Sequence, residues 1–162
     1  MSGPDRTGRD RRPLLAGLVV LVTAGLALGV LLTRTGPVDV AIPDGGDDPA
    51  CLDAGTRWPL EVAGEDERDT DPAGTAVHAW GDPAVIARCG LPALGPTTEQ
   101  CISVDGVDWV ARELSDGTAL TTFGRSPAIE VLVPAQVGQA PLVLPAFADA
   151  AKALPTNGRQ CD

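Results

Sequence analysis

The 162-residue chain has few aromatic side chains, which make up 3% of its residues with three Trp, two Phe and no Tyr. The core must therefore be built from Val, Ala, Leu and Ile, which bury less surface each, with the three Trp and two Phe as anchors. We therefore expect covalent cross-links to supply part of the stability. The length leaves room for one globular domain and an appendage.

Positive charge is also scarce beyond the first part of the chain. Five of the twelve Lys and Arg residues flank one apolar segment near the start: Arg6, Arg9, Arg11, Arg12 and Arg34. The formal net charge is −10, and the chain after Thr35 is strongly anionic. Nucleic acids and other polyanions require clustered cations, so we exclude nucleic acid as a partner.

Residues for catalysis are few as well. The sequence has one histidine, His78, and none of its serines lies in a G-x-S-x-G segment. A nucleophile needs a base beside it, and the cysteines are expected in disulfides. Asp82 is explained better as a turn residue than as a base. We predict no catalytic residue, cofactor or metal, and favour a protein that is not an enzyme.

One long apolar run begins at Leu14 and ends at Leu32. At about 1.5 Å per residue a helix of this length spans roughly 28 Å, close to the ~30 Å hydrocarbon core of a bilayer. The arginines on its N-terminal side place residues 1–13 in the cytoplasm and the rest of the chain outside. We predict a single-pass plasma-membrane anchor over residues 14–32. A cleavable signal peptide with a small-x-small site at Ala27-Leu28-Gly29 is the alternative.

Three further features concern segments outside the predicted core. Gly25 and Gly29 form a GxxxG pair, which permits weak homodimerisation of the membrane helix. Residues 33–50 are rich in Gly, Pro and Asp, and we predict a flexible acidic linker there. The acidic residues 64–71 are predicted to form a solvated loop. Residues 51–162 are predicted to be the extracytoplasmic domain.

Alternating, β-branched segments and turn residues fill this domain. A hairpin is predicted over residues 76–90, reversing at Gly81-Asp82-Pro83. The other turns are predicted at Asp105-Gly106 and Ser115-Asp116-Gly117-Thr118. Helical spacing follows over residues 141–154. We predict an α+β fold: a small antiparallel meander of five or six strands with a C-terminal helix and two disulfides, preceded by one transmembrane helix.

The four cysteines, Cys51, Cys89, Cys101 and Cys161, all follow the predicted membrane segment. An even number in an oxidising compartment predicts two disulfides, for which three pairings exist. We favour Cys89 with Cys101, because these two residues end and begin successive strands. Cys51 and Cys161 would then join the two ends of the domain. The absence of a C-x-x-C pair argues against a metal site.

If the first hairpin has a three-residue loop, His78, Trp80 and Arg88 share one face of the sheet. Two interpretations follow from this arrangement. The three side chains form a small-ligand or hydrolytic site, with Trp109 and Arg125 as further binding candidates. Alternatively, Trp80 packs under the C-terminal helix, Arg88 pairs with a carboxylate, and His78 is a half-buried strand residue.

Several short segments together resemble a known family. In chain order they are Trp80-Gly81-Asp82-Pro83, Arg88-Cys89-Gly90, Val107-Asp108-Trp109, Thr121-Thr122-Phe123-Gly124-Arg125, Glu130-Val131 and Val133-Pro134. Residues 51–161 resemble the actinobacterial family catalogued as domain of unknown function 3515. The resemblance implies an N-terminal membrane or lipid anchor and a small exported domain, and it implies no activity, substrate or cofactor. From the predicted anchor, the two expected disulfides and the lack of a catalytic set, we predict an accessory or binding module that contacts an envelope protein or a cell-wall component.

Overall fold

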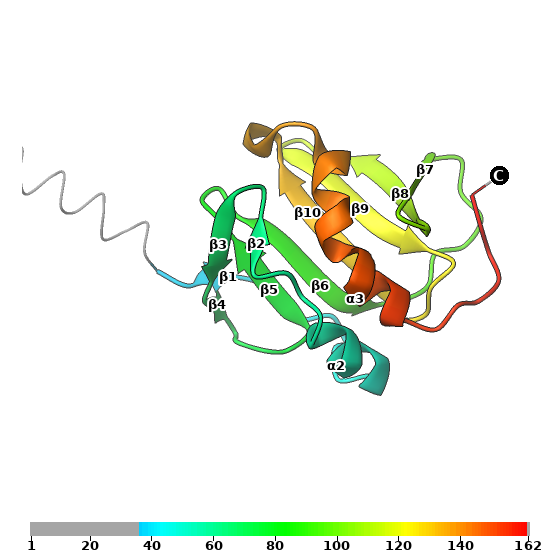
Figure 1. Cartoon of the computed structure of the whole chain (residues 1–162), viewed down its shortest axis with the longest axis horizontal. Helices are drawn as coiled ribbons and strands as arrows, with labels where there is room; N and C mark the ends of the chain where they lie inside the picture. Colours follow the sequence, from blue (N-terminus) through cyan, green and yellow to red (C-terminus); the bar gives the residue numbers. More distant parts are fainter. Residues whose placement is uncertain (1–35, 162) are drawn as a thin grey trace, which may run out of the picture. The chain divides into compact units, whose positions relative to one another are not determined.

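A sheet of eight antiparallel strands is the frame of the computed structural model, which describes residues 36–161 (Figure 1). Its strands lie in the order β2-β3-β5-β6-β10-β9-β8-β7. Their bounds are β2 Glu61–Val62, β3 Glu65–Arg68, β5 Val77–Trp80, β6 Val85–Leu91, β7 Gln100–Val104, β8 Val107–Glu113, β9 Gly117–Phe123 and β10 Ala128–Pro134.

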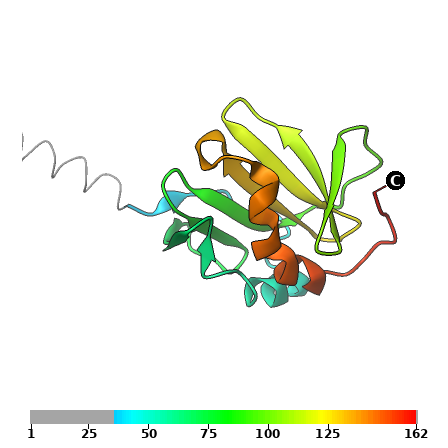
Figure 2. The ribbon, with the colours of Figure 1, turned by 45° about the horizontal axis from the view of Figure 1, so that its top comes forward.

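Helical segments cover one face of this sheet, which we call the helix face; the opposite side is the outer face. Figures 1 and 2 show η2 (Ala140–Phe147) and α3 (Ala148–Ala153) running as one continuous segment across the strands. The shorter segments are α2 (Pro49–Gly55) and η1 (Ala135–Val137). At the start of α2 the Asp48 carboxylate accepts a hydrogen bond from the backbone N–H of Ala50, at 2.8 Å, which satisfies one of the free amides of that turn.

The core lies between the helix face and these helices. Its largest fully buried side chains are Trp80, Trp109 and Phe147, and Leu120, Ile129 and Leu144 pack among them. The predicted C-terminal helix over residues 141–154 is confirmed as η2 followed by α3. Pro145 lies inside the 3₁₀ segment η2, where the chain does not have to form the i to i+4 bonds of an α-helix.

The antiparallel sheet is confirmed, but its strand count and order differ from the prediction. The sheet has eight strands instead of five or six, because the predicted solvated loop contains β3 and residues just before it form β2. Glu67 and Arg68 of β3 pair with Trp80 and Ala79 of β5. Charged side chains at this end of the sheet stay solvated while their backbone joins the ladder. The sheet is also not a simple meander, since β10 lies between β6 and β9.

The predicted linker over residues 33–50 differs from the structure in its described part. There β1 (Val38–Asp39) pairs in parallel with β4 (Thr70–Asp71), and the Val40 side chain is buried. A Cβ placed on Gly90 would come within 2.4 Å of the backbone of Gly45. Glycine at both positions lets the two backbones touch, so residues 37–50 are folded against the domain.

The predicted membrane segment, residues 14–32, lies outside the described residues, as do residues 1–13 and the Gly25/Gly29 pair. Within residues 36–161, no helix has the length and apolar character needed to cross a bilayer.

Two disulfides are confirmed, but the favoured pairing of Cys89 with Cys101 and of Cys51 with Cys161 is wrong. The bonds join Cys51 to Cys89 and Cys101 to Cys161, with Cα–Cα distances of 5.5 and 5.8 Å. The error has a topological cause. Cys89 lies in β6 and Cys101 in β7, and three strands, β10, β9 and β8, separate these two in the sheet.

This pairing predicts the outcome of a non-reducing digest of the native chain. Trypsin is expected to release one covalent assembly of the peptides 35–57, 89–112 and 160–162, because 89–112 carries both Cys89 and Cys101. Cleavage after Glu99 should then split it into 35–57 joined to 89–99 and 100–112 joined to 160–162. Mass spectrometry before and after reduction measures both steps. A looped 89–112 peptide, or free thiols, would contradict the structure.

Candidate functional site

The residues predicted to share a sheet face are divided between its two faces. In the ladder, His78 pairs with Ala87 and Trp80 with Val85, whereas Arg88 pairs with Val77. The loop of this hairpin therefore has four residues, one more than predicted. Because side chains alternate along a strand, a shift of one residue moves Arg88 to the opposite face. The predicted common face of His78, Trp80 and Arg88 is wrong.

His78 and Trp80 belong to an aromatic cluster on the helix face. The Trp80 ring stacks on His78 and meets Phe147 edge-on, with centroids 6.1 and 5.4 Å apart. Trp58 contacts both His78 and Phe147. The Trp80 indole is fully buried and donates to the carbonyl of Pro59 at 3.0 Å. These contacts agree with the packing interpretation of Trp80.

His78 lies at the margin of this cluster, with about a fifth of its side chain exposed. Its Nδ1 makes a short contact with a carboxylate oxygen of Glu67. The His78 ring therefore contacts one carboxylate, that of Glu67, and two indole rings, those of Trp58 and Trp80. His78 is held in place as a half-buried strand residue, as the packing interpretation expects.

Arg88 forms a buried ion pair on the outer face. Its Nε and Nη2 donate to Oε1 of Glu130 at 2.8 and 2.5 Å. The Glu130 side chain is 4% exposed and that of Arg88 27%. Arg112 lies 3.9 Å from the other carboxylate oxygen and is mostly exposed. Arg88 is therefore paired with a carboxylate.

The two remaining candidates also have structural surroundings. Trp109 is fully buried in the core, and its indole N–H has no hydrogen-bond partner among residues 36–161. Arg125 donates to the carbonyl of Leu154 at 2.8 Å, just after α3. A cation there satisfies a carbonyl at the C-terminal end of the helix. The five candidates do not converge on one place, and their role in binding stays a prediction.

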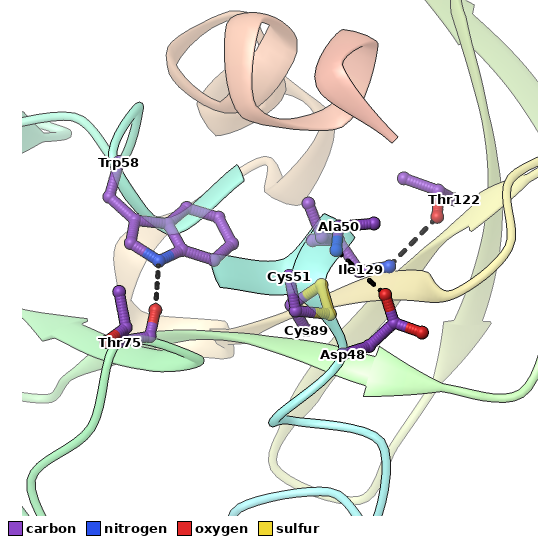
Figure 3. Close-up of a disulfide and its surroundings, with 8 residues drawn as sticks. All are labelled: Asp48, Ala50, Cys51, Trp58, Thr75, Cys89, Thr122 and Ile129. Atoms are coloured by element: carbon purple, nitrogen blue, oxygen red, sulfur yellow. Dashed lines mark hydrogen bonds between the residues drawn. A yellow bond between two sulfur atoms is a disulfide. The ribbon is translucent and has the colours of Figure 1, made fainter. Parts of the chain in front are cut away.

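The disulfide between Cys51 and Cys89 fixes α2 to the helix face of the sheet, beside this core (Figure 3). Both cysteines are fully buried. Nearby, the Trp58 indole donates to the carbonyl of Thr75 at 3.0 Å. The bond therefore holds α2 against β6, which three strands separate from β7 in the sheet.

A groove of about 470 Å³ lies on the helix face beside β7, and we call it the β7 groove. Its apolar floor includes Ile102 of β7, Ala111 of β8 and Val133 of β10. Ala135 and residues 138–141, at the start of η1 and of η2, also line it, and Gln139 is exposed. Polar side chains of Gln100, Glu113, Ser115 and Thr118 also line the groove, so it offers a ligand both apolar contacts and hydrogen-bonding groups.

The margin of the β7 groove is acidic. Glu113 lines it, Asp116 lies between two lining residues, and Glu99 and Asp105 flank β7 in the sequence; all four are exposed. Arg112 is the one cation in the sequence from residue 99 to residue 124, and it lies on the outer face near Glu130. The exposed charge in and beside the groove is therefore mostly negative.

A second hollow of about 580 Å³ lies beside the disulfide between Cys101 and Cys161. Most of its walls come from residues 96–99 and from the C-terminal residues 158–161. Seven of the fourteen residues that line the β7 groove lie on paired strands, against two of the ten that line this second hollow, and strands hold side chains more rigidly than loops do. We therefore take the β7 groove as the candidate site.

The sequence analysis did not identify the β7 groove. The turn predicted at Asp105-Gly106 is observed, and it pairs β7 with β8 so that Val104 lies opposite Val107. No local pattern indicates that β7 is the last strand of the sheet. That position depends on β10 pairing with β6, which is a contact between distant parts of the chain.

Fold and site together define a disulfide-linked domain: a mostly antiparallel sheet with a C-terminal helix over one face and a groove beside its last strand. The chain belongs to DUF3515, a family of proteins of unknown function, whose model matches residues 14–157. No curated protein and no solved structure matches the chain.

Proposed function

We propose that this chain is a non-enzymatic binding module, anchored in the plasma membrane by residues 14–32, that binds an envelope protein through the β7 groove outside the cytoplasm. The observation that carries the proposal is the groove itself: a hollow beside the last strand of the sheet, lined by apolar and polar side chains, with Glu113 among them.

Two further observations support the proposed location. Both disulfides lie in the described domain, and disulfides of this kind persist in oxidising compartments outside the cytoplasm. The family match begins at residue 14 and so includes the apolar segment. An anchor at that position would keep the groove near the membrane surface and the proteins located there.

The structural roles of the polar candidates support binding over catalysis. His78 contacts Glu67, Arg88 is paired with Glu130, and Arg125 binds a carbonyl near the end of α3. Each of these side chains already stabilises the fold. The acidic residues around the β7 groove are exposed and suit recognition of a charged partner.

Photo-crosslinking in intact cells tests this proposal. A photoreactive phenylalanine analogue at Gln139, on the groove margin, is expected to give one discrete adduct on a denaturing gel. The same analogue at Leu60, which is 84% exposed and adjoins β2 at the other edge of the sheet, is the control and should give none. The adduct partner, identified by mass spectrometry, should bind the purified full chain.

Binding of that partner should also depend on the groove. Ala111→Phe places a larger side chain on the groove floor and is expected to weaken binding of the partner by about tenfold or more, with unchanged circular dichroism. Equal adducts at Gln139 and Leu60, or binding that Ala111→Phe leaves unchanged, would refute the proposal.

A further inference from the structure

We infer that the β7 groove takes an extended, positively charged segment of its partner, which pairs with β7 as a ninth strand. This inference rests on the proposed function and specifies how the partner is bound. It follows from three features of β7: the direction of its backbone groups, the position of the groove and the local charge.

The backbone of β7 offers two residues for strand addition. Asp105 and Gly106 form a two-residue turn with φ values of 50° and 78°, so Val104 and Val107 exchange hydrogen bonds beside it. The alternation of antiparallel pairs then turns the N–H and C=O groups of Cys101 and Ser103 away from β8. Within residues 36–161, β7 is last in the strand order and pairs with β8 alone.

Cys161, the last residue that the structure describes, is held on the outer face and not along the edge of β7. Cys161 is bonded to Cys101, whose side chain points to that face, and its N–H donates to Asp108 at 2.8 Å. The Ser103 hydroxyl contacts the same carboxylate. These contacts fix residue 161 over the sheet, so that the outward N–H and C=O groups of Ser103 face solvent.

The groove lies where alternate side chains of an added strand would point. Gln100 and Ile102 of β7 face the helix side and line the groove. A strand paired along β7 directs every second side chain to that same face. Backbone hydrogen bonds to Cys101 and Ser103 would supply affinity, and an apolar side chain beside Ile102 would supply specificity, as in other cases of strand addition.

Charge determines the kind of segment. Glu113 lines the groove, Asp116 lies between two of its lining residues, and Glu99 and Asp105 flank β7 in the sequence; all four are exposed. Pairing of β7 with β7 of a second copy would bring these carboxylates together, which costs free energy. A segment with Lys or Arg on both sides of an apolar residue removes this repulsion. We therefore assign the edge to a basic segment of another protein.

The test uses the full chain in detergent and the acetylated, amidated peptide Lys-Lys-Thr-Leu-Thr-Lys-Lys, in which two Lys share the face of Leu and two lie on the other face. We expect saturable binding by fluorescence anisotropy, with slower hydrogen exchange of the Cys101 and Ser103 amides by NMR. The peptide with Glu in place of each Lys, and the peptide N-methylated at alternate residues, should bind at least tenfold more weakly. Exchange is measured on the unaltered protein, so this readout does not depend on any variant folding.

A matched pair of variants isolates the backbone contact. Ser103→Pro removes one outward N–H and leaves the ladder with β8 intact, because that N–H does not point to β8. We expect it to weaken peptide binding by about tenfold, the effect of one hydrogen bond of about 1.4 kcal/mol. Ser103→Ala also loses the hydroxyl contact with Asp108 but keeps the N–H, so it should bind the peptide at least fivefold more tightly than Ser103→Pro does.

Several outcomes would overturn the inference. They are no saturable binding, equal binding of the acidic or N-methylated peptide, unchanged amide exchange at Cys101 and Ser103, or a dimer that forms through β7 and excludes the peptide. The failure of this inference is distinguishable from that of the proposed function. If the protein crosslinked at Gln139 binds the Ser103→Pro variant as tightly as the unaltered chain, the proposed binding function is supported and only strand addition is refuted.

Discussion

Trp80→Ala is expected to lower the free energy of unfolding by about 3–5 kcal/mol, the range for large aromatic side chains removed from a core. Trp80 is fully buried and packs against His78 and Phe147. Its removal also leaves the Pro59 carbonyl without its indole donor. Such a loss is a large fraction of the 5–15 kcal/mol typical of a domain. Equilibrium unfolding in urea, followed by circular dichroism, measures it.

Two comparison variants show whether the loss comes from the core. Trp80→Phe keeps a ring in the cluster and should cost clearly less than Trp80→Ala. Leu60→Ala changes a side chain that is 84% exposed and is expected to stay within about 0.5 kcal/mol of the unaltered protein. If Trp80→Ala lowers the free energy of unfolding no more than Leu60→Ala does, Trp80 does not lie in the core of the domain.

The buried ion pair on the outer face gives the second large effect. Arg88→Met is expected to lower the free energy of unfolding by about 3–5 kcal/mol, because it leaves the 4% exposed Glu130 carboxylate without its partner. Glu130→Leu should cost less, since Arg88 is 27% exposed and can turn its guanidinium toward water. The double variant should be more stable than Arg88→Met alone, because no charge remains buried. Urea unfolding of all three completes a double-mutant cycle.

Arg112→Met is the matched control for this cycle. Arg112 also approaches Glu130, but at 3.9 Å and with 56% of its side chain exposed. Exposed ion pairs contribute about 0–1 kcal/mol. An Arg112→Met loss as large as that of Arg88→Met, or a double variant less stable than both single ones, would contradict the assignment of the ion pair.

Trp80→Ala and Arg88→Met change two side chains that were predicted from the sequence as candidates for a binding surface. For His78, Trp80 and Arg88 the sequence allowed either a binding site or packing and ion pairing, and the observed contacts agree with packing and ion pairing. It misplaced Arg88 because the loop after Trp80 has four residues rather than three. Loop length sets the register of a hairpin, and the register sets which face each side chain occupies.

The pairing of the cysteines was mispredicted for a related reason. Their number and their position after the apolar segment were enough to predict two disulfides. Their pairing depends on which strands are neighbours in the sheet. Strand β10 pairs with β6 across about 40 residues of chain, and β7 lies at the far end of the strand order. No pattern around Cys89 or Cys101 indicates this separation.

The sequence by itself determined the features that depend on local chemistry. Hydrophobic alternation and turn residues indicated an antiparallel sheet, helical spacing indicated the C-terminal helix, and the four cysteines indicated two disulfides. Tertiary structure alone decided the strand order, the disulfide pairing, the division of His78 and Arg88 between two faces, and the β7 groove. Propensity and alternation act over a few residues, whereas these four features arise from pairing between strands that are distant in the sequence.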